Sequence, residues 1–494
     1  MVVPSRKDNN GRAGRRFLIR RGTTISLILM LIISIYLMAL DFLGSYSSND
    51  TGYRPHPKFD MEQVKQEVNR RRMGPGSLRQ VKPGWFDRFT SSRDSDNNRG
   101  VVEVNTDDTS SSNQALQVLL SASVHLIDIR QDLRAMADAS DDKTYTGIIA
   151  EFCELDFTAQ RRDPSLVPMF RQLVNSSPGC ASGKHYEVDL KAFSYLARIH
   201  DVSGQDKEVK ALPLQGVVFH ESRCGSTLVA NALVAMDPPA HRVFSESAPP
   251  IAALRTVCGE TYQFCSVAQA ASLLQDVMYA MSRSNDPLEK RLFFKIQSIG
   301  SRNLEVFQEA FPTTPWVFVY RNPVQVMTSH LEQGVSHANC VIRRHPGGGG
   351  GDPLVKHFLN ERDIDKHSLS DVEYCAAHLA TITDSAVKAI ERAPMMGRAV
   401  NYADLPHVLW EEVFSNHFNM EITDEQLENI KSISGVYSKG TAGRHGTFKD
   451  DTEKKERTAT QEMRDASERF LDESYQLLLL EYGFETKEHE ETIE

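Results

Sequence analysis

The residues best suited to chemistry follow a short apolar run near the middle of the chain. The run 214–220 is rich in Val and Phe, and a helical apolar pattern resumes at Leu228. Between them lies a polar loop that continues into the predicted helix; its residues are Glu221, Ser222, Arg223, Cys224, Gly225, Ser226 and Thr227. Backbone N–H groups at a helix N-terminus, two hydroxyls and an arginine together suit a phosphate or sulfonate. The alternative is a strand-to-helix turn without a ligand, in which Gly225 permits the bend and Arg223 is solvated.

A second cationic position follows another buried-strand pattern. The segment 315–320 has the apolar composition of a strand and ends in Arg321. Asn322 is a good N-cap and Pro323 a good first helical residue, so a helix is predicted to start here, with Ser329 on its second turn. Open α/β sheets bind ligands at the carboxyl ends of their strands, which is where Arg321 would lie.

Side chains that can accept a proton also follow apolar runs. The apolar run 243–245 ends in Glu246, which is our first candidate for the base. The alternatives left open are Glu221, His220 and His330. Lys295, at the end of the strand-like run 292–296, would either serve the acceptor or pair with an acid.

Strand-like runs alternate with helical patterns from residue 212 onward. This alternation predicts an α/β fold, with a parallel sheet flanked by helices. We expect a helical N-terminal extension over 114–211, because Leu116, Leu119, Leu120, Val124 and Ile127 recur at helical spacing. The acidic segment 486–494 is expected to be a solvated tail.

The N-terminal part has the organisation of a membrane anchor. Residues 1–21 carry seven basic residues against the single acid Asp8, and 22–40 carry no charge. Nineteen helical residues span about 28 Å, close to one hydrocarbon core, and the basic flank places residues 1–21 in the cytosol. We therefore expect a single-pass type II signal-anchor, followed by a flexible stem over 41–113. A cleaved signal peptide is the rival interpretation.

The net charge and the cysteine content limit which ligands and cross-links can be expected. The net charge is -10, and no basic patch is obvious, so nucleic-acid binding is not expected. Seven cysteines, without a C-x-x-C pair or zinc-type spacing, predict no structural zinc. Two disulfide pairings are open, Cys153 with Cys180 and Cys258 with Cys265. Sequons at Asn49 and Asn175 would suit a luminal glycoprotein.

Four elements, in this order, resemble the sulfotransferase superfamily. The resemblance covers most of residues 212–485 and implies that they form a catalytic domain with a P-loop-type parallel sheet flanked by helices. The loop 222–227 looks like its 5'-phosphosulfate loop, with Arg223 where cytosolic members have Lys, and Arg321 with Ser329 looks like its 3'-phosphate motif. The segment 398–405 is similar to the family's strand and Tyr-x-Asp-Leu turn. Lys439 and Gly440, followed by Gly443, resemble the C-terminal loop that closes over the nucleotide. Cys224, Ser438 and the glycine run 347–351 depart from the family pattern.

The resemblance implies transfer of a sulfonate group from 3'-phosphoadenosine 5'-phosphosulfate (PAPS), without a metal, to a hydroxyl or amine. Arg223 would then stabilise the leaving phosphate, and Arg321, Ser329 and Lys439 would hold the 3'-phosphate. The resemblance to membrane-bound Golgi members implies a Golgi membrane protein with a luminal catalytic domain. Its acceptor would be a glycan, a glycoprotein or a small alcohol.

Three other classes of protein share features of this sequence. The chain lacks the G-x-x-x-x-G-K-[ST] motif that a P-loop kinase or GTPase would carry. A Golgi glycosyltransferase would share the anchor and the stem, but Asp363-Ile364-Asp365 lies in a polar segment with no preceding strand. A non-catalytic luminal protein that binds a nucleotide or glycan with the same fold also stays open.

Overall fold

The computed structural model describes most of the chain beyond residue 100. The described residues are 101–103, 111–131, 145–204, 206–256, 266–332, 334–344, 351–437, 446–447 and 451–484. The expected cytosolic tail, membrane anchor, most of the stem and the acidic tail therefore lie outside them. Among these residues, no helix combines the length and the apolar character that crossing a bilayer requires.

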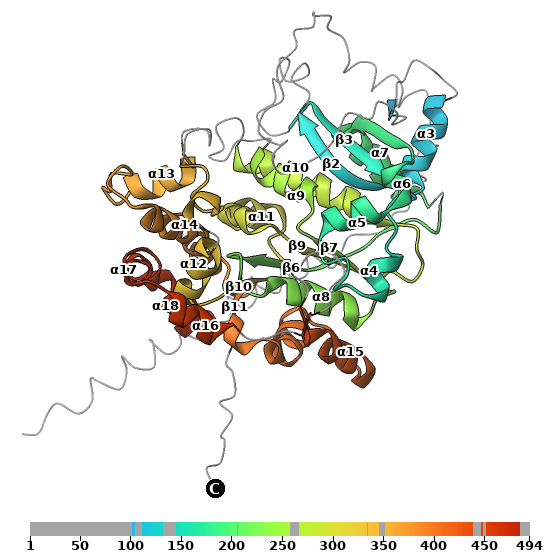
Figure 1. Cartoon of the computed structure of the whole chain (residues 1–494). Coiled ribbons are helices and arrows are strands. Elements are labelled where there is room, and N and C mark those ends of the chain that lie inside the picture. Colours follow the sequence, from blue (N-terminus) through green and yellow to red (C-terminus); the bar gives the residue numbers. More distant parts are fainter. Residues whose placement is uncertain are drawn as a thin grey trace, which may run out of the picture. The chain divides into compact units, whose positions relative to one another are not determined.

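A five-stranded parallel sheet forms the centre of the fold, as the sequence predicts (Figure 1). Its strand order is β11-β10-β6-β9-β7, and each neighbouring pair is parallel. The strands are β6 (Leu214–His220), β7 (His241–Ser245), β9 (Arg291–Lys295), β10 (Trp316–Tyr320) and β11 (Gly397–Asn401). Because β9 and β10 lie on opposite sides of β6, the direction of strand addition changes beside β6, and such a switch point is where ligands bind in open α/β sheets.

Both faces of this sheet are buried, which explains the continuous apolar runs of its strands. Phe219 and Phe294 face one core cluster, together with residues of α10 (Val267–Ser282), α11 (Leu304–Ala310) and α14 (Asp371–Arg392). Val218 and Phe293 face a second cluster with α8 (Ser226–Met236) and α15 (Asp424–Ser434). Figure 1 shows α10 and α11 on one side of the strands and α8 with α15 on the other.

The C-terminal helices complete the domain. Two successive helices near the C-terminus, over 461–470 and 472–480, are separated at Leu471, where the backbone leaves helical geometry. A third core cluster joins α12 (Pro323–Leu331), α13 (Pro353–Asn360) and α14 to α17 (Gln461–Phe470). The remaining helical segments are α9 (Ala248–Ile251), η3 (Ala252–Thr256), η4 (Ser298–Asn303), η5 (Val335–His337), η6 (Tyr402–Asp404), η7 (Leu409–His417), α16 (Thr452–Thr458) and α18 (Asp472–Leu480).

The expected helical extension over 114–211 is only partly helical. The helix α3 (Ser111–Leu120) is followed by strands, which join β1 in a second sheet of order β1-β4-β3-β2. The predicted helix ends at Leu120, and Ile127 of the helical spacing lies in a strand instead. The elements are β1 (Val101–Glu103), β2 (His125–Gln131), β3 (Ile148–Cys153), α4 (Thr158–Arg162), α5 (Phe170–Ser176), α6 (Pro178–Ala181), β4 (His185–Asp189) and α7 (Leu190–Ser203). Two short strands, β5 (Lys210–Ala211) and β8 (Arg283–Ser284), pair with each other.

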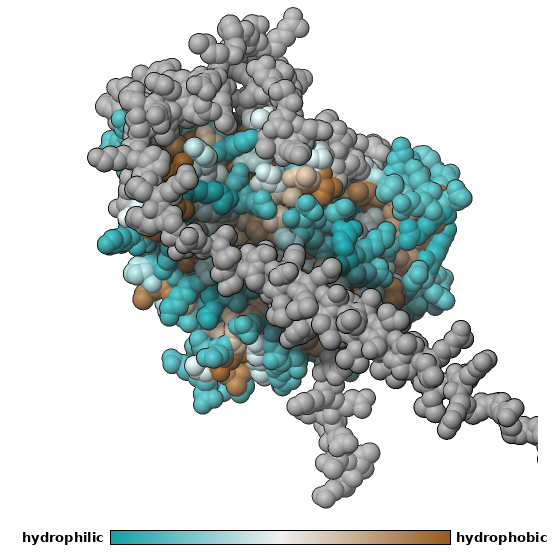
Figure 2. Space-filling view, turned by 180° about the vertical axis from the view of Figure 1, so that it is seen from behind, coloured by the Kyte–Doolittle hydropathy of each residue, from teal (hydrophilic) through white to brown (hydrophobic). Residues whose placement is uncertain are grey.

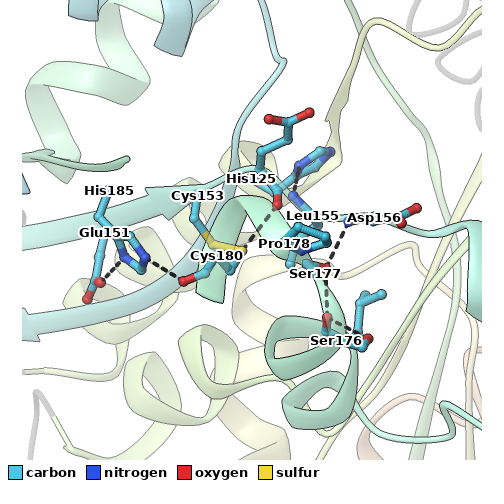
Figure 3. The surroundings of a disulfide bond; sticks show 12 residues. His125, Glu151, Cys153, Leu155, Asp156, Ser176, Ser177, Pro178, Cys180 and His185 are labelled. Atoms are coloured by element: carbon cyan, nitrogen blue, oxygen red, sulfur yellow. Dashed lines mark hydrogen bonds and ion pairs between the residues drawn. A yellow bond between two sulfur atoms is a disulfide. The ribbon is translucent and has the colours of Figure 1, made fainter. Parts of the chain in front are cut away.

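Two disulfides cross-link the described part of the chain. Cys153 pairs with Cys180, one of the two expected pairings, whereas Cys258 and Cys265 lie outside the described residues. Figure 3 shows this bond beside the buried His185, whose Nδ1 lies 2.6 Å from Glu151 Oε1 and whose Nε2 lies 2.8 Å from the Cys180 carbonyl oxygen. The second bond, between Cys340 and Cys375, was not anticipated from the sequence.

The surface of the described residues is mainly hydrophilic on the face seen in Figure 2, where apolar residues form small separate areas. Large exposed apolar side chains are scattered; they include Tyr195, Val202, Leu288, Met395 and Leu480. Isolated exposed apolar residues are normal for a folded domain, so this surface does not identify a binding face.

Candidate active site

The loop after β6 has the backbone of an anion-binding turn. Ser222, Arg223 and Gly225 have φ values of 78°, 59° and 82°, and α8 begins directly after them. A Cβ atom on Gly225 would lie 2.9 Å from Cδ2 of Tyr402, so glycine is required for both its conformation and its close contact. Left-handed geometry at two non-glycine residues costs roughly 1–3 kcal/mol each, and such strain occurs mostly at functional sites.

The first two residues of α8 carry unsatisfied hydroxyls. Ser226 Oγ and Thr227 Oγ1 are buried, and neither has a hydrogen-bond partner in the described part of the chain. A buried hydroxyl without a partner costs about 1–3 kcal/mol, so a partner is expected in the functional state. An anionic oxygen at the N-terminus of α8 would supply one to each hydroxyl. Arg223 is exposed beside this position, whereas Cys224 is fully buried.

Arg321 lies at the carboxyl end of β10 and is held rigidly. Its side chain is only 4% exposed, its guanidinium lies 3.9 Å from the ring centre of Tyr402, and its Nε donates to Gln325 Oε1 at 2.7 Å. Asn322 caps α12 as expected, because its side chain accepts from the backbone N–H groups of residues 324 and 325. The Tyr402 ring therefore lies next to both the Arg321 guanidinium and Gly225 of the loop.

Glu221 links the loop to Arg321. Strands β6 and β10 are paired, and Glu221 Oε1 accepts a hydrogen bond of 2.5 Å from the backbone N–H of Arg321. Complete burial raises the pKa of Glu221 to about 8, against the opposing effects of that hydrogen bond and of the Arg321 charge. Glu221 is therefore mainly protonated at neutral pH and positions Arg321 relative to the loop. Its burial also separates it from a reacting acceptor.

Ser329 lies on α12 as predicted and is buried. Its hydroxyl donates to the carbonyl oxygen of Gln325 at 2.9 Å, so Ser329 and Arg321 contact the same residue. Lys439 and Gly440 lie outside the described residues. The segment that contains them connects β12 (Val436–Tyr437) to β13 (Gly446–Thr447), which pair as antiparallel strands.

Glu246, the first candidate for the base, lies at the carboxyl end of β7 with φ 57°. It forms an ion pair with Lys295, whose side chain is 1% exposed against 30% for Glu246. His220 Nε2 lies 3.6 Å from Glu246 Oε1. The His220 Nδ1 accepts from the Ser222 backbone N–H at 3.1 Å, which places the proton of the neutral ring on Nε2, facing Glu246. The sheet thus brings together Glu246, Lys295 and His220, which the sequence names only separately.

The other candidates are less well placed. His330 lies on α12, and its charge helps, after burial and Arg302, to lower the pKa of His378 on α14. His330 is therefore close to α14. Asp363 and Asp365 lie in the turn after α13 and not at a strand end, which removes the metal-binding motif expected of many glycosyltransferases. Within the described ranges, no group of three or more His, Cys, Asp or Glu residues is arranged to hold a metal ion.

A further group at the site was missed from the sequence. Asp451, Thr452 and Lys455, at the start of α16, approach Arg321: its Nη2 lies 2.8 Å from Asp451 Oδ1 and 3.1 Å from Thr452 Oγ1. These contacts join residues about 130 positions apart, and no local pattern marks them. Only the packing of α16 on α12 brings them to Arg321.

No protein-family model and no characterised protein sequence matches the chain. Several solved structures resemble it, and they are sulfotransferases. Sulfotransferase STF9 from Mycobacterium avium has a TM-score of 0.30 at 13% identity, over 49% of this chain and 74% of its own. The sulfotransferase domain from the curacin biosynthetic pathway has a TM-score of 0.29 at 13% identity, over 53% and 98%. Sulfotransferase STF1 from Mycobacterium tuberculosis H37Rv has a TM-score of 0.31 at 14% identity, over 57% and 81%. At TM-scores of about 0.3, these likenesses do not assign a function to this chain.

Proposed function

We propose that this protein is a sulfotransferase that moves a sulfonate group from PAPS to a hydroxyl or amine of its acceptor. The observation that carries the proposal is the pair of cationic positions at the ends of the adjacent strands β6 and β10. One is the Arg223 loop, with two buried hydroxyls that lack hydrogen-bond partners among the described residues, and the other is the buried Arg321. Two separate anion sites suit a nucleotide with phosphates on both its 5' and 3' positions.

In the proposed reaction PAPS supplies an activated sulfonate, and the residues of the site act on it. The acceptor oxygen or nitrogen forms a bond to sulfur as the bond from sulfur to the 5'-phosphate oxygen breaks. Glu246 takes the proton of the acceptor, and the electron pair of the broken bond stays on the phosphate of adenosine 3',5'-bisphosphate. Arg223 and the N–H groups of the loop stabilise the charge on that leaving oxygen, and the residues at Arg321 hold the 3'-phosphate.

Nucleotide selectivity tests this proposal. We expect adenosine 3',5'-bisphosphate to raise the melting temperature of the full-length protein clearly more than AMP or ATP, because only the bisphosphate reaches both anion sites. Arg321→Ala should abolish this preference and leave weak binding at the Arg223 loop. Equal shifts with the three nucleotides would contradict the proposal. A transfer screen with labelled PAPS against glycan, peptide and small-alcohol pools would then identify the acceptor.

A second candidate is a protein that binds the same nucleotide without transferring sulfonate. The pairing of Glu246 with Lys295 favours this candidate, since a carboxylate neutralised by a buried lysine is a weaker base. Binding of adenosine 3',5'-bisphosphate combined with no transfer to any acceptor pool, and no slow hydrolysis of PAPS, would identify it.

We also propose a single-pass type II protein of the Golgi membrane, with the described residues in the lumen. The two disulfides support an oxidising compartment, and Asn175 of the sequon is exposed on α5. Protease added to sealed microsomes should leave the region after residue 41 intact, and peptide-N-glycosidase should reduce its mass. Digestion of that region in intact vesicles would contradict the assigned topology.

A further inference from the structure

One carboxylate occupies the position at Arg321 where a phosphate is expected. Asp451 Oδ1 lies 2.8 Å from Nη2 of Arg321, and Asp451 Oδ2 lies 2.7 Å from Nζ of Lys455. Each oxygen of the carboxylate thus contacts a different cation. Thr452 adds a hydroxyl 3.1 Å from the same guanidinium nitrogen. Two cations and a hydroxyl around one anion are a typical phosphate environment.

The partners of this carboxylate are fixed, whereas Asp451 itself faces solvent. The side chains of Arg321 and Lys455 are 4% and 11% exposed, but that of Asp451 is 44% exposed. Asp451 is also the residue that precedes α16, so its side chain can turn outward without disturbing the helix. Arg321 and Lys455 therefore form the fixed side of the site, and the side chain of Asp451 is the group that can move out of it.

The cations here outnumber the carboxylates that neutralise them. Burial first, and then the charges of Arg321 and Arg223, lower the pKa of Lys455 despite its bond to Asp451. Two acids on the flanks are already engaged: Glu332 pairs with Lys454, and Glu456 pairs with Arg464. Asp451 supplies a single negative charge and two acceptor oxygens, whereas a phosphate monoester supplies nearly two charges and three terminal oxygens.

We propose that Asp451 is an internal anion that a 3'-phosphate displaces on binding, and that Lys455 is a further cation of the 3'-phosphate site. This inference rests on the proposed function and adds a specificity device to it. Without the 3'-phosphate, Asp451 keeps Arg321 and Lys455 satisfied. With it, the phosphate takes over both cations and Asp451 turns into solvent.

Charge-matched substitutions on α16 test the inference. In the full-length protein, Asp451→Asn should tighten binding of adenosine 3',5'-bisphosphate about fivefold, because the competing charge is gone while the side-chain shape is kept. It should leave the affinity for AMP unchanged or lower it. Glu453→Gln removes the same charge from an exposed position of the same helix and is the control. Titration calorimetry with the two nucleotides measures both affinities.

Lysine variants test the second half of the inference. Lys455→Met should weaken binding of adenosine 3',5'-bisphosphate about fivefold to tenfold and leave AMP binding unchanged. Lys454→Met, at the exposed neighbouring position, is the control and should change neither affinity. Melting temperatures without nucleotide identify any variant that folds poorly.

The outcomes separate this inference from the proposed function. If the unmodified protein binds adenosine 3',5'-bisphosphate no better than AMP, the proposed function itself fails. If it prefers the bisphosphate, but Asp451→Asn behaves like Glu453→Gln or weakens binding, Asp451 is no competitor of the phosphate and the inference is overturned. An Lys455→Met variant with unchanged affinity for the bisphosphate would remove Lys455 from the site.

Discussion

The pairing of Glu246 with Lys295 makes the role of the base open to a sharp test. Glu246→Gln keeps the size of the side chain and a hydrogen-bonding group, but removes both the charge and the proton acceptor. Lys295 is 1% exposed, so its ammonium group would lose its carboxylate in a place that water does not reach. The substitution should therefore affect stability and transfer together, and the two effects have to be separated.

The magnitudes follow from the burial of the pair. Removing one partner of a fully buried ion pair costs about 3–5 kcal/mol. Glu246 is 30% exposed, so part of its charge is already screened, and we expect a loss of about 1–3 kcal/mol, or roughly 2–6 °C in melting temperature. Loss of a general base lowers transfer by roughly 10²-fold.

A second substitution separates the two effects. Lys295→Met in the Glu246→Gln background removes the unpaired cation, so the melting temperature should return most of the way to that of the unmodified protein. Transfer should stay low, because the proton acceptor is still absent. Lys295→Met alone keeps Glu246 and should retain most of the transfer rate.

The assay is a single-turnover transfer of labelled sulfonate from PAPS, followed from pH 5.5 to 8.5 beside thermal unfolding. Recovery of transfer together with stability in the double variant would refute the assignment and leave Glu246 as a structural partner of Lys295. Unaltered transfer in Glu246→Gln would move the role to His220 or His330.

Three further perturbations follow from the structure. Arg223→Ala should lower transfer roughly 10²- to 10³-fold with little change in melting temperature, since Arg223 is exposed; a large loss of stability would contradict its assignment to the leaving group. Glu221→Gln should gain melting temperature relative to the unmodified protein as pH rises from 5 to 9. Because burial raises the folded-state pKa of Glu221 to about 8, the unmodified protein loses stability as pH rises from the unfolded pKa near 4.5 through 8, and glutamine does not; a pH-independent difference would refute the raised pKa. Cys340→Ser should lower the melting temperature by several degrees under oxidising conditions but much less after reduction, and an equal effect in both would contradict the Cys340–Cys375 bond.

The central sheet could be predicted because its strands carry their signal locally. Strands β6 and β10 are buried on both faces, so they consist of continuous Val and Phe runs, and each is followed by the polar residues that begin the site. The cap at Asn322 and the glycine at Gly225 mark the helix starts in the same local way. The sequence therefore placed the Arg223 loop and Arg321 directly after strands, where the structure has them.

The failures arise where the structure depends on long-range packing. Ile127 of strand β2 continues the apolar spacing of the preceding helix, so the sequence predicts that the helix extends through it. The Lys295–Glu246 pair depends on the register of β7 and β9, in which Ser245 lies beside Lys295. Strand order cannot be predicted from one sequence, so the sequence does not decide whether Lys295 serves the acceptor or pairs with an acid.

Glu221 shows why the two anion positions can lie so close together. Its carboxyl group lies between the loop and Arg321, and a negative charge there would repel a nucleotide that carries phosphates on both sides. A pKa of about 8 leaves the group mainly protonated at neutral pH, so it spaces the two strand ends and still accepts the hydrogen bond from Arg321 without opposing the ligand. A bound bisphosphate would raise this pKa further, and binding near pH 8 would then be coupled to proton uptake. The burial that excludes Glu221 as a base is thus the property that would make it suitable as the neutral support of both proposed phosphate sites.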